Sequence, residues 1–230
     1  MSIVVQVGFP NGGSSGIQVD ELPDFCPVCH ANVHPIFLVG RSLSDAPFST
    51  IDAAYQCTRS LCRSVFIGRY KGSGIGGTGQ PYILTSLAPK TPQHATFSKE
   101  IEKVSPSFVE IYNQAMAAEA LGLNQLVGMG LRKALEFLVK DFAISLATTD
   151  EEKENIRKKQ LGPCITDHIK DEPVRKAAKR ATWLANDETH YERRWEDKDI
   201  TDVKQLVRLT VNAVENAILM KQYETEMPES

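Results

Sequence analysis

The pattern of apolar and polar positions changes near residue 91. Before it, short runs rich in β-branched and aromatic residues alternate with turn residues, which predicts strands over residues 3–7, 33–39, 53–57, 64–70 and 82–87. After it, apolar residues recur at three- and four-residue steps, the period of an amphipathic helix. The chain is therefore expected to be an α+β protein: a β module over residues 1–90, a proline-containing linker over 91–106, and an all-α bundle over 107–226.

Start signals divide the helical half into separate helices. They predict helices over residues 108–120, 124–146 and 150–159, two more that begin near Pro163 and Pro173, and a last one after Thr201. Ser107 and Glu110 have the spacing of a capping box, and Asn124 is a candidate N-cap. Gly128 and Gly130 lower helix propensity, so we expect them to let a neighbouring helix approach closely.

Composition narrows the class of protein. The chain has 230 residues, of which 42% are hydrophobic and 24% charged, enough for a sizeable core in one domain or two. A formal net charge of −3 argues against a protein built mainly as a polycationic nucleic-acid binder. The first residues lack the basic leader and apolar run of a secretion signal, and no apolar stretch is long enough to span a bilayer. We therefore expect a cytoplasmic protein without a membrane partner.

Four of the five cysteines form two close pairs. They are Cys26-Pro-Val-Cys29 and Cys57-Thr-Arg-Ser-Leu-Cys62. Each pair can place two thiolates on one tight turn, and two such turns together make the tetrahedral sulfur cage that Zn²⁺ favours. The alternatives are two disulfides, which are typical of short secreted chains, or four unrelated buried thiols. The spacing favours a structural zinc as the cofactor of a zinc-ribbon-like module.

Two groups of basic residues are candidates for nucleic-acid contact. The first surrounds the second cysteine pair and consists of Arg59, Arg63, Arg69 and Lys71, interleaved with Phe66 and Tyr70. Phosphate contact and base stacking use this mixture, although a charged exterior is also ordinary on a small β module. The second group, in the helical half, is Lys170, Arg175, Lys176, Lys179 and Arg180, near Trp183. Nearby acidic residues make a solvated face the more common interpretation there.

A glycine pattern, Gly72-x-Gly74-x-x-Gly77, has phosphate-cradle spacing. It runs into a β-type segment instead of opening a helix, so we expect a hairpin loop and no nucleotide cofactor.

Three segments of the helical half carry a recognisable order of residues. They are Tyr112-Asn-Gln-Ala115, the run from Gly128 to Arg132 and Glu136, and Leu184-Ala-Asn186-Asp187-Glu-Thr-His190. Over roughly residues 98–220 this set resembles the helical "domain of unknown function 4145" family, which is related to the HEPN superfamily. The resemblance implies a HEPN-like homodimer in a bacterial cell or a phage-infected host, acting in restriction, phage defence or phage counter-defence. Its motif residues would be Arg132, Glu136, Asn186, Asp187 and His190.

Spacing alone suggests contacts for some of these residues. Arg132 and Glu136 are four apart and can pair on one helix face. Asn186 and His190 share that spacing, and we expect His190 to make a structural hydrogen bond between helices.

The surroundings of His190 bear on whether the protein is a ribonuclease or a non-enzymatic protein. In active HEPN ribonucleases an arginine precedes the histidine with four to six residues between them, and here those positions hold Ala185, Leu184 and Trp183. Arg193 and Arg194 follow His190 and could supply a cation only through a loop that folds back. The leading hypothesis is thus a non-enzymatic recognition and dimerisation protein that binds a protein partner or nucleic acid. The alternatives are a metal-independent HEPN-type endoribonuclease using His190, and an adaptor that binds only protein.

Overall fold

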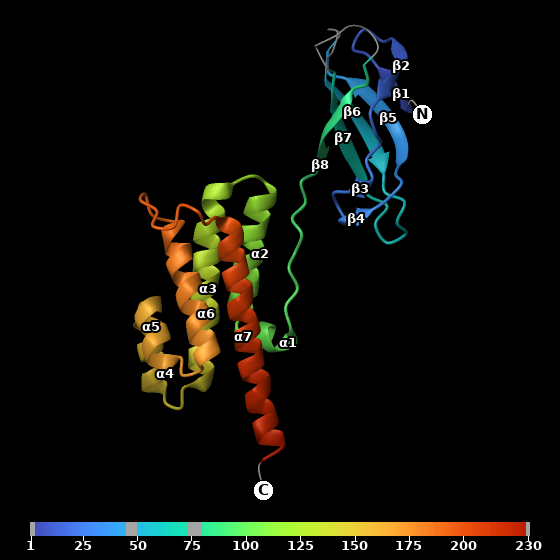
Figure 1. The fold of residues 1–230 in the computed structure, drawn as a ribbon. Coiled ribbons are helices and arrows are strands. Elements are labelled where there is room, and N and C mark those ends of the chain that lie inside the picture. Colours follow the sequence, from blue (N-terminus) through green and yellow to red (C-terminus); the bar gives the residue numbers. More distant parts are fainter. Residues whose placement is uncertain (1–2, 45–49, 73–79, 229–230) are drawn as a thin grey trace. The chain divides into compact units, whose positions relative to one another are not determined.

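The computed structural model describes residues 3–44, 50–72 and 80–228 (Figure 1). The chain separates into two compact units, Met1–Thr91 and Pro92–Ser230. Over the described residues it is an α+β protein, in which a six-stranded sheet is followed by seven helices. Each unit has its own hydrophobic core.

The sheet of the first unit has the strand order β2-β1-β5-β6-β7-β8. Its strands are β1 (Ile3–Gly8), β2 (Ser14–Val19), β5 (Ile36–Ser42), β6 (Thr50–Gln56), β7 (Val65–Lys71) and β8 (Ile83–Ala88). Among the strand pairs described, β1 and β5 pair in parallel and the other neighbours pair antiparallel. A bridge between Val19 and Tyr82 joins the end of β2 to the residue before β8, so the sheet curls until its two edges meet.

The curled sheet encloses the core of this unit. Along β6, Ile51, Ala53 and Tyr55 are buried and alternate with partly exposed residues, as the two-residue period of a strand requires. Two short strands, β3 (Phe25–Cys26) and β4 (Ala31–Asn32), form a separate hairpin around the first cysteine pair. The hydrophobic pattern does not predict β2, β3 or β4, because β2 is polar and glycine-containing and the other two have two residues each.

The second unit is a helical bundle. Its helices are α1 (Lys99–Val104), α2 (Pro106–Ala120), α3 (Asn124–Leu146), α4 (Asp150–Lys158), α5 (Leu161–His168), α6 (Glu172–Asp187) and α7 (Ile200–Glu226). The expected close approach at the α3 glycines is confirmed. A Cβ atom on Gly130 would lie 2.8 Å from the Cβ of Ala115 in α2, and one on Gly128 would lie 3.1 Å from the Cβ of Glu188.

Several expected boundaries differ from the structure. The stretch 91–106, expected to be a linker, contains α1, which is capped by Ser98 and buries Ile101 in the helical core. Ser107 is not a cap, because α2 begins at Pro106, and the Ser105 hydroxyl donates to the Asp141 carboxylate (2.5 Å).

At α3 the expected cap is also displaced. Asn124 is its first helical residue, and Leu123 precedes it without a side-chain cap. The expected caps lie two residues (Ser107) and one residue (Asn124) past the observed N-cap positions, which is the usual scale of error for helix ends.

Among the helices described, none is long and apolar enough to cross a membrane. Gly74 and Gly77 of the glycine pattern lie outside the described residues.

Candidate metal centre and the motif residues of the helical unit

The two cysteine pairs come together at one end of the sheet. All four Sγ atoms lie within 4.8 Å of one another, with 3.9 Å between Cys26 and Cys62 and 3.8 Å between Cys29 and Cys57. Four sulfurs bound tetrahedrally at about 2.3 Å from Zn²⁺ are about 3.8 Å apart. A disulfide needs about 2.05 Å, and all four cysteines are free. The residues therefore fit a metal ion, as expected, and the alternatives of two disulfides or four unrelated thiols are wrong.

The backbone forms a similar turn at each cysteine pair. The N–H of His30 donates to the carbonyl of Cys26 (2.9 Å), and the N–H of Arg63 donates to the carbonyl of Arg59 (3.1 Å). His30 and Arg63 each follow the second cysteine of a pair and have φ values of 55° and 51°. Residues other than glycine adopt this left-handed conformation rarely, and it persists where the surroundings hold it. Metal–sulfur bonds from the adjacent cysteine would provide that restraint.

The thiols of the cluster have divergent proton affinities. Burial raises the pKa of Cys57 to about 12, and burial also raises the pKa of Cys26. Hydrogen bonds from the side chain and backbone of Ser64 lower the pKa of Cys62 to about 6. Four thiolates this close repel one another, and a divalent cation offsets that repulsion. With four thiolate ligands the coordination shell is complete, which is typical of a structural zinc and not of a catalytic one.

Two aromatic residues expected to stack on nucleic acid are buried. Phe66 is 1% exposed and Tyr70 is fully buried, and the Tyr70 hydroxyl lies 2.7 Å from the Tyr55 hydroxyl. Burial raises the pKa of Tyr70, and Tyr55 raises it further. Both rings belong to the core of the sheet, so the expectation that they stack on bases is wrong.

The basic residues of the first candidate group are also dispersed. Arg69 and Lys71 lie in β7. A strand from Val65 to Lys71 is about 20 Å long, so Lys71 lies far from the start of β7. Arg69 donates two hydrogen bonds of 2.7 Å to the Asp52 carboxylate, which neutralises it. Arg59, within the Cys57–Cys62 turn, and Arg63, directly after it, are exposed beside the cysteine cluster.

Arg132 joins α3 to α6. Its Nη1 donates to Glu136 (3.1 Å), which confirms the expected pair, and its Nε donates to Oδ1 of Asn186 (2.6 Å). Lys140 also contacts Glu136, at 2.7 Å. Burial alone would raise the pKa of Glu136, but Lys140 and Arg132 together lower it. The guanidinium therefore organises the packing of two helices.

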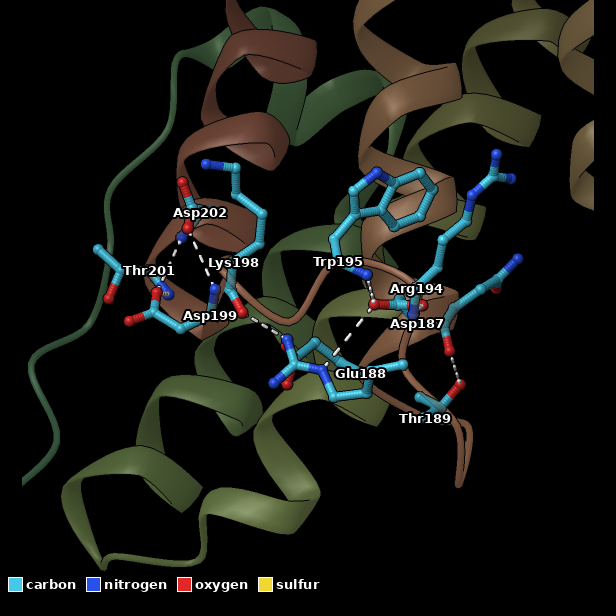
Figure 2. Close-up of polar contacts among 11 residues, drawn as sticks. Asp187, Glu188, Thr189, Arg194, Trp195, Lys198, Asp199, Thr201 and Asp202 are labelled. Carbon is cyan, nitrogen blue, oxygen red and sulfur yellow. Dashed lines mark hydrogen bonds and ion pairs between the residues drawn. The ribbon is translucent and has the colours of Figure 1, made fainter.

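Asp187 holds the loop between α6 and α7 (Figure 2). The residue is 6% exposed, and its carboxylate accepts hydrogen bonds from the backbone N–H groups of Arg194 (2.6 Å) and Trp195 (3.0 Å). Arg193 lies 3.9 Å from the same carboxylate. Burial opposes ionisation, but these two hydrogen bonds and Arg193 outweigh it and lower the pKa of Asp187. The loop is thus closed onto an ionised, buried carboxylate.

His190 lies in this loop, beyond the end of α6. Its side chain is exposed and makes no hydrogen bond within the described residues, so the expected role between helices is wrong. Arg193 donates to Glu188 and to the carbonyl of Lys198 (2.5 Å), and the Arg194 guanidinium lies 5.2 Å from the centre of the Trp195 ring. Both arginines that could assist His190 are therefore engaged by other groups.

Comparison with protein-family models, with curated proteins and with solved structures finds no match for the chain.

Proposed function

We propose that the chain is a non-enzymatic recognition protein whose N-terminal unit is held in shape by a structural zinc ion. The observation that supports this most directly is the set of four sulfurs at tetrahedral spacing. A closed thiolate shell has no open position for water or substrate, so it suits a structural role. In its paired cysteine turns the unit is zinc-ribbon-like.

The recognition surface of this unit is the loop between Cys57 and Cys62. Leu61 is 95% exposed and is flanked by the exposed cations Arg59 and Arg63. A large apolar side chain held out on a metal-fixed turn suits insertion into a groove of another protein. The two arginines favour a partner with acidic residues around that groove. Protein is the favoured partner of this surface, because no exposed aromatic side chain of the first candidate group remains to stack on a base.

The helical unit is, on this proposal, a HEPN-like dimerisation domain. Its family, and its setting in restriction, phage defence or counter-defence, are proposed on the resemblance of the residue pattern alone. Dimerisation is supported by α7, which exposes an apolar stripe along its outer side: Leu209, Met220, Tyr223 and, just beyond the helix, Met227. These residues are spaced so that they share one face of a helix.

The proposal is tested by removing the metal. Chelation with a strong zinc chelator should expose the first unit to proteolysis and leave the tryptophan fluorescence unchanged, because both tryptophans lie in the helical unit. Unchanged protease resistance after complete metal removal would contradict the structural role of zinc.

The partner class is tested by replacing Arg59 and Arg63 with glutamine, which should leave any affinity for DNA or RNA unchanged. A loss of that affinity would contradict the assignment of a protein partner.

A further inference from the structure

Both tryptophans of the chain line one cavity in the helical unit. The cavity has a volume of about 280 Å³ and is lined by Arg180, Trp183, Leu184, Trp195, Lys198 and Leu206. Trp183 comes from α6, whereas Trp195 and Lys198 come from the loop before α7. The Asp187 contacts with that loop fix Trp195 in this position.

A second cavity adjoins the first at Trp183. Its volume is about 560 Å³, and its polar lining includes Arg132, Lys179 and Asn186. Trp183 is 50% exposed and lines both cavities. The half-exposed indole ring of Trp183 therefore lies between two cavities on one face of α6.

The charged residues that line the two cavities are predominantly basic. In the described ranges Lys179 and Arg180 have no ion pair, and Arg180 donates only to the carbonyl of Lys176 (3.1 Å). Lys198 pairs with Asp197 at 3.2 Å, but that carboxylate is 76% exposed, so solvent screens the pair. Glu136 is the acidic residue that lines the second cavity, and Arg132 and Lys140 already neutralise it.

Single exposed aromatic residues are common on protein surfaces and need no ligand. Here the exposed ring is combined with a second tryptophan, two adjoining cavities and unpaired cations on the same helix. Indole faces stack on bases of any sequence, and lysine and arginine neutralise the phosphates between them. We propose that this face of α6 binds single-stranded nucleic acid, with a base stacked on Trp183 and phosphates held by Lys179 and Arg180. This inference goes beyond the proposed zinc-dependent role, because it concerns the other unit.

The test measures binding of the full chain to fluorescent single strands of DNA and RNA about ten nucleotides long, at about 50 mM and 200 mM salt. Trp183→Ala should weaken binding about 5- to 150-fold, and Trp183→Phe should retain most of the affinity because a ring remains. Tyr191→Ala is the matched control, since Tyr191 is an exposed aromatic residue outside both cavities, and it should leave the affinity unchanged.

The charge contribution is tested by the double variant Lys179→Gln/Arg180→Gln. Loss of two phosphate contacts should weaken binding and reduce the slope of log affinity against log salt by about 1.4. The same exchange at Arg157 and Lys158, exposed on α4, should change neither quantity.

Three results would overturn the inference. They are no binding of either strand at low salt, wild-type affinity in Trp183→Ala, and equal competition by a polyglutamate peptide, which would indicate an acidic protein as the ligand. Zinc chelation separates this inference from the proposed function. Strand binding that survives metal removal supports an independent site on α6, whereas its complete loss would contradict that placement.

Discussion

Replacement of Asp187 by asparagine tests how the α6–α7 loop is held. The native carboxylate is 6% exposed and accepts two backbone hydrogen bonds, at 2.6 and 3.0 Å. A hydrogen bond to a buried charged group contributes about 1.5–3 kcal/mol. Asparagine keeps one acceptor oxygen but turns an NH₂ group toward the second amide, so one charge-assisted bond is lost and the other is weakened. We expect the free energy of unfolding of the helical unit to fall by about 2–4 kcal/mol.

Urea unfolding followed by tryptophan fluorescence measures this loss. Both tryptophans, Trp183 and Trp195, lie in the helical unit, so the signal reports that unit alone. Asp197→Asn is the matched control in the same loop, because its side chain is 76% exposed, and it should change stability by less than about 0.5 kcal/mol. If Asp187→Asn is as stable as the control variant, the carboxylate does not hold the loop.

The same variant should alter the pH dependence of stability. The folded pKa of Asp187 is lowered from an ordinary value of 3.8, so its contribution is present above about pH 4 and is lost as the pH falls through the lower folded pKa. The difference in stability between the wild type and Asp187→Asn should therefore shrink on acidification below that pH. A difference that stays constant down to pH 2 would mean that ionisation of Asp187 is not its source.

Gly130→Ala should destabilise the helical unit by about 1–3 kcal/mol, since its new Cβ would lie 2.8 Å from that of Ala115. In the same urea assay Gly162→Ala, which meets no atom within 4 Å, should be neutral or stabilise by up to about 1 kcal/mol, and equal effects would refute the packing argument. His190→Ala should not change RNA integrity in an incubation with single-stranded and transfer RNA, whereas cleavage by the wild type that the variant lacks would establish the ribonuclease alternative. Light scattering at micromolar concentration should show a dimer that Met220→Glu dissociates, and a wild-type mass near 25.5 kDa would contradict dimerisation through α7.

Local signals in the sequence were sufficient for the metal ligands and for most helices. The short spacing within each cysteine pair restricts it to one tight turn, and Pro163 and Pro173 do lie in the first turns of α5 and α6. The Arg132–Glu136 pair also follows from helical spacing alone. Each of these features depends on residues close together in the chain.

Features that depend on distant residues could not be predicted in this way. The bridge from Val19 to Tyr82 that closes the sheet joins segments with no shared sequence signal. The burial of Phe66 and Tyr70 could have been found, because with Gly68 they alternate along β7 and so share one face.

The cavity lined by Trp183 and Trp195 also could not be predicted from the sequence. Trp183 and Trp195 line the same cavity, and the hydrogen bond from the Trp195 N–H to Asp187 helps to hold the intervening loop against the helix. Nothing in the order of residues marks this contact, although the basic residues near Trp183 were visible as a group.

X-ray absorption at the zinc edge reports directly whether the four cysteines hold one structural zinc ion. The protein purified under reducing conditions should contain one zinc per chain with four sulfur neighbours at about 2.3 Å and no nitrogen or oxygen neighbour. Replacement of Cys57 by serine should remove one sulfur from that shell. A folded protein without zinc, or a shell with an open position occupied by water, would exclude a structural zinc at these four cysteines.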